Sequence, residues 1–416
     1  MVVLAVLAVL GSLPYWLPRT VVAARIRIFA RINGDEGIPV PGDLVGLEDF
    51  RRVYEDPAAD GRSRGAVLSD LFWYWLAPGP QVHQEHLEPG PRYQDVARTT
   101  RRVLATTMAH AERSATECAE RVLGGLGGRR LVRLRDLMMP IWAEFNYELV
   151  YGEKCPRHAR DLIIGNANDV VSSIKCTGLR HMDRRERLTT YLLDNLHRVA
   201  HPLPALLDEQ ERAWYLQGTF FNTAVVQSSE AMTHLLLVLA EKPGAQQRIA
   251  DGDDAVLDEV VDETFRRFPL FGIAHRITSA DIVVDERRTI PKNSVLCFNY
   301  PAFHEAGGSI PFGVAGNRPC PARVVAPITM RAVARAVLTR FTVHSTARHT
   351  RSMPNRGPCV LVPRGGRKPL ALLAFVRARD RWEDVWRGVV QLVLGTYMVW
   401  DARRQRLCQR HFAGHD

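Results

Sequence analysis

The stretch PFGVAGNRPCPAR, residues 311–323, restricts the fold and chemistry of this chain more than any other. Its glycines and small side chains let backbone amides approach the sulfur of Cys320, and the prolines on either side of that cysteine fix its backbone. A helical pattern follows from about Ala322, so we expect the sulfur near a helix N-terminus, where a thiol pKa is lowered. Such a thiolate is suited to ligate a soft metal or haem iron; a buried structural cysteine is the alternative.

The composition narrows the class of protein. Of the 416 residues, 46% are hydrophobic and 24% charged, a ratio that excludes disordered and fibrous proteins. The net charge is +10, but only five of the 55 cationic residues are lysines and the arginines are scattered, so no nucleic-acid partner is expected. Seven cysteines without a CxxC pair argue against a disulfide framework and a structural zinc site, and favour a reducing cytoplasm.

Hydrophobic periodicity predicts a chain that is mainly α with a minor β part. The predicted helices cover residues 93–124, 130–151, 184–199 and 210–241. The predicted strands are short and late, at residues 281–290, 294–300 and 359–364. Phosphate-binding glycine motifs and hydrolase motifs are absent, so a nucleotide enzyme or a serine hydrolase has little support.

Both ends of the chain are unusually apolar. Residues 1–17 carry no charge and precede a group of arginines, which suits either a membrane anchor or an element folded onto the body. From Arg377 onward, apolar residues recur at helical spacing, which suits either a packed C-terminal helix or a helix lying on a membrane. We therefore divide the chain into an N-terminal extension at 1–34, a catalytic domain at 35–364 and a C-terminal helical extension at 365–416.

A second motif precedes the cysteine loop. Glu263 and Arg266 stand at positions i and i+3 of a helical run, where they can form an ion pair. Together with Arg318 and Cys320, in this order, they resemble the cytochrome P-450 family of haem-thiolate enzymes. The resemblance covers roughly residues 35–364 and implies the P-450 fold, with the haem between the long I helix and the L helix. It also implies heme b as the cofactor, with Cys320 as the axial thiolate ligand of its iron.

The resemblance implies roles for further residues. Glu263 and Arg266 would form the structural ion pair of the family, although the 57 residues from Glu263 to Cys320 are fewer than the family has, and no match to the usual third partner of the pair is found. Arg276 and Arg318 would contact the haem propionates. Phe312 would pack beneath the thiolate, although it lies one residue too early in the loop.

The remaining propionate contact is expected from the helix at 93–124. Arg98, Arg101 and Arg102 are the candidates there, and Arg98 is our choice. A solvated helix face is the alternative for each of these arginines.

The helix at 210–241 is similar to the I helix of the family but departs from its pattern. Counted back from the end of the helix, the oxygen-activating threonine falls on Gln227 and its acidic neighbour on Val226. Ala224 keeps the small residue that leaves room above the iron, and a slip of one residue would put Ser228 at the alcohol position. Because Val226 cannot relay protons, the acid–alcohol pair that delivers protons to bound oxygen is replaced.

The resemblance implies a haem-thiolate enzyme that acts on a hydrophobic small molecule, with oxidative tailoring in specialised metabolism as the leading function. The alternative is an atypical enzyme that does not use dioxygen, through nitrene-type transfer or cyclisation, peroxide use, dehydration or isomerisation. A haem-binding partner subunit and a membrane-associated structural protein are weaker alternatives.

Partners and location follow from the same resemblance. If dioxygen is used, a separate ferredoxin and reductase must supply the electrons, and an acidic ferredoxin could dock on a basic face. The arginines of that face are Arg318, Arg323, Arg331 and Arg335. We expect a cytoplasmic protein, with contact of the two termini to a membrane surface as a further option.

Overall fold

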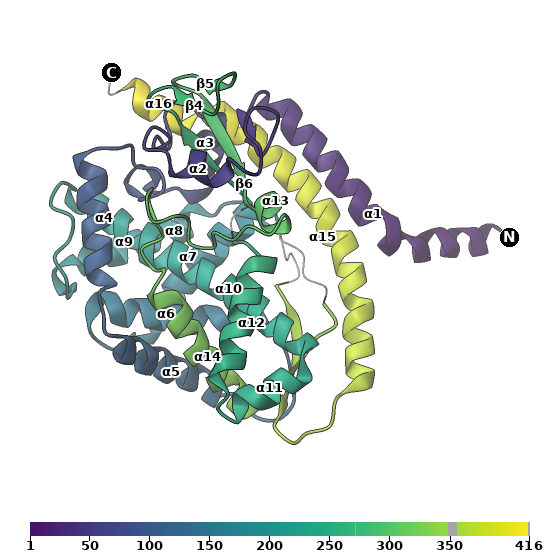
Figure 1. Ribbon diagram of the computed structural model, residues 1–416. Helices are drawn as coiled ribbons and strands as arrows, with labels where there is room; N and C mark the ends of the chain where they lie inside the picture. Colours follow the sequence, from purple (N-terminus) through teal and green to yellow (C-terminus); the bar gives the residue numbers. More distant parts are fainter. Residues whose placement is uncertain (271, 348–355, 415–416) are drawn as a thin grey trace.

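The computed structural model describes residues 1–270, 272–347 and 356–414, and most of these are helical (Figure 1). The α-helices are α1 (Val2–Asn33), α2 (Phe50–Glu55), α3 (Val67–Leu76), α4 (Pro91–Val103), α5 (Met108–Gly124), α6 (Leu134–Tyr151), α7 (Arg157–Ile174), α8 (Met182–Asp194), α9 (Glu209–Leu216), α10 (Val225–Glu241), α11 (Pro243–Ala250), α12 (Asp254–Arg267), α13 (Tyr300–Glu305), α14 (Val325–Arg340), α15 (Leu370–Gln405) and α16 (Leu407–Ala413). The strands are β1 (Ile38–Val40), β2 (Arg130–Arg133), β3 (Ile273–Ile277), β4 (Ile282–Val283), β5 (Thr289–Ile290), β6 (Val295–Asn299), β7 (Phe341–His344) and β8 (Pro358–Pro363).

One long helix runs through the core. α9, the π-helical segment η3 (Gln217–Ala224) and α10 join into a continuous helix over Glu209–Glu241, which confirms the helix predicted at 210–241. It begins with a capping box, in which the Asp208 carboxylate accepts the Glu211 N–H at 2.8 Å and the Glu211 carboxylate accepts the Asp208 N–H at 3.2 Å. π-helical turns inside α-helices are rare and concentrate at functional sites, so η3 marks the part of this helix to inspect.

The strands form small sheets at the edge of the helical body. β6 pairs in parallel with β1 and antiparallel with β3, and β8 lies between β2 and β7. β4 and β5 form a hairpin, so the single strand predicted at 281–290 is divided into two short strands joined by a turn. β3 is an edge strand paired with β6, and its adjacent residues His275 and Arg276 point to opposite faces of the sheet, where both are buried.

Two predicted helices are wrong in their boundaries. The run 93–124 is divided into α4 and α5, because the Thr107 hydroxyl accepts the His110 N–H and starts a new helix. The run 130–151 begins as β2, whose residues pair with β8 some 230 positions later in the chain, and only then becomes α6. A local hydrophobic pattern cannot reveal a strand pairing with residues so distant in the chain.

The two ends of the chain fold together. α1 and α15 lie side by side and run in the same direction (Figure 1), since Tyr15, Val21 and Phe29 of α1 meet Arg381, Gly388 and Gly395 of α15 in that order. Near its C-terminal end, α15 packs on α3 through a separate apolar cluster. The predicted boundaries at 34 and 365 fall in the connections after α1 and before α15.

Two helices of the described residues are long and apolar enough to cross a membrane. One is the central helix, and 72% of its apolar window is buried in the core. The other is α1, and none of its apolar window is buried. Burial in the core therefore explains why the central helix is apolar. It does not explain why the apolar window of α1 is apolar.

Candidate functional site

A cavity lies between the central helix, the start of α14 and the loop that carries Cys320. It encloses about 1430 Å³ of space free of protein atoms, part of which is open to solvent. Aromatic and aliphatic side chains form most of its walls, and the charged residues that line it are Arg62, Glu85 and Arg318. The cavity thus has the character of a site for an apolar ligand with anionic groups at one edge.

Cys320 faces this cavity. Burial raises the pKa of its thiol to about 11, although the Ala322 amide and the Arg323 charge act in the opposite direction. The expectation of a lowered pKa is wrong because burial outweighs the effect of the Ala322 amide; the sulfur also lies before a turn at residues 321–324, and α14 begins only at Val325. A thiol in this state is protonated at neutral pH, and a bound metal would have to displace its proton.

Phe312 lies beside the cysteine despite its early position in the loop. Its carbonyl oxygen accepts the Cys320 N–H at 2.9 Å, which closes the loop into a compact turn. Its ring meets Phe265 of α12 edge-on, with the ring centres 5.0 Å apart. Both rings line the cavity, so the loop and α12 together form an aromatic wall next to the sulfur.

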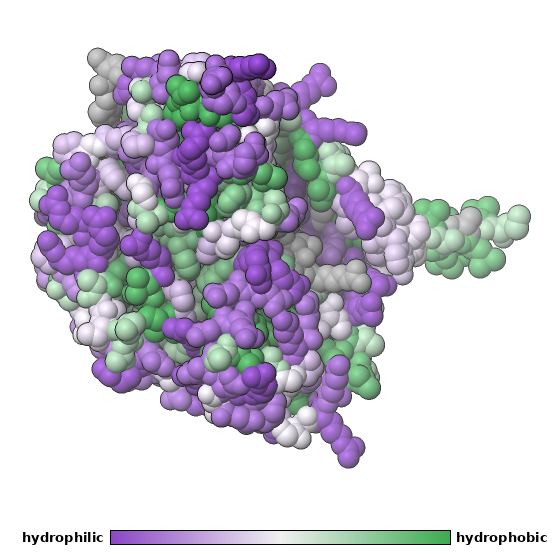
Figure 2. Space-filling model, in the orientation of Figure 1, coloured by the Kyte–Doolittle hydropathy of each residue, from purple (hydrophilic) through white to green (hydrophobic). Residues whose placement is uncertain are grey.

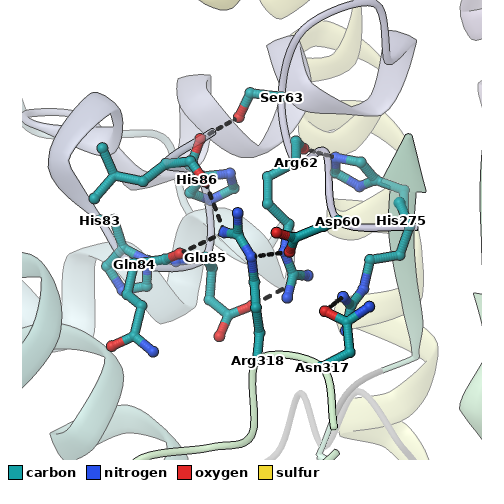
Figure 3. Close-up of polar contacts among 12 residues, drawn as sticks. Asp60, Arg62, Ser63, His83, Gln84, Glu85, His86, His275, Asn317 and Arg318 are labelled. Atoms are coloured by element: carbon teal, nitrogen blue, oxygen red, sulfur yellow. Dashed lines mark hydrogen bonds and ion pairs between the residues drawn. The ribbon is translucent and has the colours of Figure 1, made fainter. Parts of the chain in front are cut away.

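Arg318 connects the loop to the charged edge of the cavity. Its backbone has a φ of 49°, in the left-handed region that arginine seldom adopts. Its side chain forms an ion pair with Asp60, donates to the carbonyl of Leu87 at 2.7 Å and lies 3.8 Å above the ring of Tyr93. Figure 3 shows this side chain rising from the loop between Asp60 and the segment that carries Glu85.

Two more arginines approach the same edge. Arg62 lines the cavity, and its Nη1 lies 3.7 Å from Glu85 Oε2. Arg276 of β3 is completely buried behind the lining, over the ring of Tyr54, and donates to Asn317 Oδ1 at 2.8 Å. Burial raises the pKa of Glu85, but Arg62 and the other nearby cationic groups outweigh it and hold that pKa below its usual value.

The arginines keep free hydrogen-bond donors. Among the described residues, nothing accepts from Nε of Arg62, from Nε and Nη2 of Arg276 or from Nη2 of Arg318, and all four atoms are buried. Three guanidinium groups thus face two nearby carboxylates, those of Asp60 and Glu85. Because a buried charge is stable only when it is paired, this edge is built for a further anion.

The histidines at this edge do not supply additional charge. Burial lowers the pKa of His83 and of His86, and lowers that of His275 to about 4. All three are therefore neutral at pH 7 and act as hydrogen-bonding groups. The positive charge of the edge belongs to the arginines (Figure 3).

The central helix forms the wall opposite the charged loop. Ala224, Gln227 and Ser228 line the cavity, as the comparison with the I helix predicted. Val226 does not, because it lies on another face of the helix and packs in the core. The structure also brings Thr223 to this wall, four residues before Gln227 and one helical turn away.

Thr223 is hydrogen-bonded to a histidine from across the cavity edge. His83 Nε2 lies 2.8 Å from Thr223 Oγ1. His83 Nδ1 accepts the Glu85 N–H at 3.2 Å, so the ring proton is assigned to Nε2 and donates to the threonine. The imidazole fits against Gly218 of η3, where a Cβ would stand 3.1 Å from its Cδ2.

Arg98 is not brought to the cavity. It lies on the exposed face of α4, while the buried face of that helix carries Thr99 and Thr100. Tyr93, one turn earlier, reaches the charged edge instead and lies under Arg318. Arg62, from a segment where no site residue was predicted, supplies the cationic group that we expected from α4.

The ion pair expected between Glu263 and Arg266 is also not formed. Glu263 pairs with Lys242 and, at 3.1 Å, with Arg267, and these interactions lower its pKa. The Arg266 side chain is exposed. Lys242 and Arg267 occupy the two carboxylate oxygens of Glu263, so Arg266 is left without its expected partner.

The expected basic face is largely neutralised. Arg318 is buried at the cavity, Arg331 pairs with Asp258, and Arg335 pairs with Asp254 and Glu112. Arg323 remains exposed at the start of α14. A strongly cationic docking surface for a ferredoxin is therefore not present on these four residues.

The cavity fits a haem group. A macrocycle requires a broad apolar space, which the aromatic walls provide, and a cysteine facing one side of it, which is Cys320. Its two propionates require cationic donors at one edge, which the unpaired guanidinium N–H groups of Arg62 and Arg318 provide, with Arg276 directly behind them. Two carboxylates at this place would supply the missing anions.

Comparisons with known proteins agree on the fold. No protein-family model and no curated protein sequence matches the chain. A solved cytochrome P-450 from Thermus thermophilus is similar with a TM-score of 0.59 and 17% identity, over 75% of this chain and 90% of that one. Cytochrome P-450 BioI, in complex with an acyl carrier protein ligated to hexadec-9Z-enoic acid, is similar with a TM-score of 0.57 and 15% identity, over 76% and 91%.

A third solved structure, the cyanobacterial CYP120A1 with bound retinoic acid, has a TM-score of 0.59 and 13% identity, over 76% of this chain and 87% of that one. The chain therefore has the cytochrome P-450 fold, mainly α with a minor β part. In that fold the central helix is the I helix, α12 is the K helix and α14 is the L helix.

Sequence reasoning missed some residues of the cavity, chiefly Arg62, His83, Tyr93 and Thr223. His83 and His86 carried a weak signal, since two histidines and a glutamate fall together in the segment VHQEH. Thr223 lies one turn before Gln227 on the face already identified. Nothing in the sequence indicates Arg62, because only the folding of its segment against β3 brings it to the cavity.

Proposed function

We propose that this chain is a haem-thiolate enzyme of the cytochrome P-450 type, with heme b in the cavity and Cys320 as the axial ligand. The observation that carries the proposal is the combination, within this fold, of a cysteine facing an apolar cavity and unpaired guanidinium donors at the edge of that cavity. When bound, thiolate-ligated haem supplies the oxidative chemistry that no side chain of the chain can perform.

The residues of the chain have separate tasks in this proposal. Arg62 and Arg318 hold the propionates by charge-assisted hydrogen bonds, and Arg276 stabilises that anionic edge from behind. Phe312 and Phe265 exclude water from the cysteine side. On the side of the cavity opposite Cys320, the small side chain of Ala224 on the central helix leaves space for substrate.

The substrate is proposed to be a hydrophobic small molecule. The cavity walls are mostly aromatic and aliphatic. Two of the similar structures hold a long apolar chain, hexadec-9Z-enoic acid ligated to an acyl carrier protein in one and retinoic acid in the other. Burial of such a chain in the cavity contributes about 0.8 kcal/mol of favourable free energy for each CH₂ group, so long apolar substrates are favoured over small polar ones.

Thr223, oriented by His83, is proposed to deliver protons on the substrate side. His83 Nε2–H donates to Thr223 Oγ1 and leaves the threonine O–H to donate into the cavity; water entering the cavity replaces a proton that the hydroxyl gives up, because the neutral imidazole has no second proton to supply. Such a relay takes the place of the acid–alcohol pair that Val226 and Gln227 do not provide. Gln227 and Ser228 stay as hydrogen-bonding groups on the same wall.

An oxidation with dioxygen, redox partners and this relay is the leading reaction; an atypical reaction without dioxygen is the second. The second is favoured by Val226, which packs in the core and cannot deliver protons to the cavity. Measuring turnover with and without dioxygen and a ferredoxin–reductase pair separates them. Turnover that requires both supports the oxidation, and turnover with neither supports the atypical reaction.

The haem assignment has a direct test. The reduced protein with carbon monoxide should give the red-shifted Soret band of thiolate-ligated haem, and Cys320→Ser should abolish that band while Cys359→Ser, in a buried strand away from the cavity, should keep it. A band that survives Cys320→Ser would remove the assignment of the ligand.

The relay is tested by Thr223→Val, which keeps the side-chain shape and removes the hydroxyl. We expect turnover to fall by about 10²-fold or more, the usual contribution of a positioned proton donor. Ser228→Ala, on the same wall, is the matched control and should fall much less. Equal losses in the two variants would contradict the proposed role of Thr223.

A further inference from the structure

α1 and α15 expose two apolar surfaces, and the contact of Tyr15 with Arg381 joins them. The first is the tip of α1, residues 1–18, which contains no charged side chain and extends away from the body as a green projection in Figure 2. The second is the outer face of α15. Its residues are Trp382, Trp386, Val389, Val393, Tyr397 and Trp400.

The outer face of α15 is a continuous stripe. Its six residues recur at intervals of three and four, so they share one side of the helix over about 27 Å. The opposite side is buried: Gly395, Met398 and Ala402 pack toward the body, and Gln391 donates to the carbonyl of Lys175 at 2.8 Å. Because the buried face of α15 packs against the body, the helix cannot rotate, and the stripe remains exposed on the surface.

The stripe is too apolar for a surface in water. Between Arg387 and Asp401, where four of the six stripe residues lie, the sequence of α15 contains no charged residue; Trp382 and Trp386 lie in the preceding segment 379–387, which carries three arginines and three acidic residues. Trp386 is 68% exposed and Val393 is 61% exposed. A contiguous apolar patch of this kind marks a contact with a protein or a membrane.

The charges around the patch favour a membrane with anionic lipids. α1 carries arginines at Arg19, Arg25, Arg27 and Arg31 and no acidic residue. No ion pair within the described part of the chain involves these arginines. Cationic residues next to an apolar segment attract anionic headgroups, by about 1 kcal/mol for each arginine near the surface.

The aromatic residues lie where a membrane interface would need them. Tyr15 and Trp16 lie at the end of the uncharged tip of α1, shortly before Arg19, and three of the six stripe residues are tryptophan. Tryptophan and tyrosine prefer the headgroup level of a bilayer.

The two helices can meet one bilayer together. They run side by side in the same direction, and α1 bends near Pro14 and Pro18, so its tip departs from the direction of α15 (Figure 1). Sixteen residues of helix reach about 24 Å, short of the roughly 30 Å hydrocarbon layer, so the tip alone is a marginal anchor. Contact by the stripe adds the apolar surface that the tip lacks.

We propose that the outer face of α15, together with the tip of α1, docks this protein on an anionic phospholipid bilayer. α15 lies along the surface with its stripe among the headgroups and acyl chains, and the tip of α1 enters the hydrocarbon layer. This inference does not depend on haem binding or on the reaction proposed above.

The test is flotation of the full-length protein with vesicles, either of phosphatidylcholine alone or of phosphatidylcholine with phosphatidylglycerol. We expect binding to the anionic vesicles, and a loss of about tenfold or more in the Trp386→Glu, Val393→Glu double variant. The matched control is Met108→Glu with Leu206→Glu, which alters two similarly exposed apolar residues on the far side of the molecule and should bind as the original does.

The other outcomes overturn the proposal. If the double variant binds like the original, α15 does not contact lipid. If the original fails to bind anionic vesicles, neither surface docks there. If sedimentation shows a dimer that the double variant converts to a monomer, and vesicles do not compete with dimerisation, the stripe is the contact with a second copy of this chain.

Discussion

Glu230 of the central helix is a buried carboxylate that holds two cationic side chains. It is buried beneath the cavity wall and accepts from Arg135 Nη1 at 2.8 Å and from Lys175 Nζ at 2.8 Å. Arg135 is itself only 1% exposed. Glu230→Gln keeps the shape of the side chain and removes the negative charge, which leaves two cations without a counterion in the core.

The expected cost follows from two estimates. Burial raises the pKa of Glu230, but Lys175 and Arg135 outweigh it and lower that pKa from 4.5 to about 2. At about 1.36 kcal/mol for each unit of pKa, this corresponds to about 3 kcal/mol of stabilisation by the charged form. Removal of one partner of a buried ion pair usually costs about 3–5 kcal/mol. We therefore expect Glu230→Gln to lower the free energy of unfolding by about 3–5 kcal/mol at pH 7.

The pH dependence gives the same prediction a second form. Because the folded-state pKa is lowered, the stabilising contribution is complete above about pH 4.5 and is lost as the pH falls toward 2. The difference between the original protein and Glu230→Gln should therefore shrink below pH 4.5. Urea denaturation, followed by far-UV circular dichroism between pH 3.5 and pH 7, measures both quantities.

Glu263→Gln is the matched control. Its partners Lys242 and Arg267 are more than a third exposed, so the pairs are worth at most about 1 kcal/mol. The losses in unfolding free energy of the two variants show which glutamate contributes more to stability. The sequence motif pointed to Glu263, whereas the structure points to Glu230. A larger loss for Glu263→Gln than for Glu230→Gln would refute the reasoning.

Three further predictions concern the cavity edge and α15. Arg318→Met should weaken haem binding by about 10-fold to 100-fold, since a charge-assisted hydrogen bond is worth about 1.5–3 kcal/mol. Arg98→Met should leave haem binding unchanged. Haem titration followed at the Soret band compares the affinities of the two variants. Arg276→Met should leave the haem-free protein as stable or more stable in urea, because a buried guanidinium with two free N–H groups is removed, and a clear loss of stability would count against unpaired charge there. Burial, together with the charges of Asp384 and Glu383, raises the pKa of Asp380 to about 7. Ionisation of Asp380 therefore destabilises the folded state increasingly from about pH 4 to pH 7. Asp380→Asn should raise the thermal midpoint at pH 8 and leave it unchanged at pH 4.

The local features of the site could be predicted because they depend on residues close together in the chain. The loop around Cys320 and the long helix at 210–241 follow from spacing and periodicity, and the resemblance to the family placed Phe312 beside the cysteine and Ala224, Gln227 and Ser228 on the inward face of that helix; the structure has all four at the cavity. Val226 is turned away for the same reason, since adjacent residues of a helix point in directions about 100° apart.

Features that depend on distant contacts could not be predicted. Arg98 belongs to a helix whose face is decided by packing against the central helix, and Arg62 reaches the cavity only because its segment pairs with β3. The pairing of Glu263 with Lys242 instead of Arg266 depends on the end of α10, which lies 21 residues earlier in the chain.

The sequence by itself determined that the chain is a mainly α protein with a cysteine loop, a long central helix and two apolar ends, because these features are written in residue spacing. Only the tertiary structure decided which arginines face the cavity, that His83 reaches Thr223, and that α1 and α15 run side by side with a stripe left exposed. The physical reason is that burial, ion pairing and exposure are properties of neighbours in space, and those neighbours come from segments that are far apart in the chain.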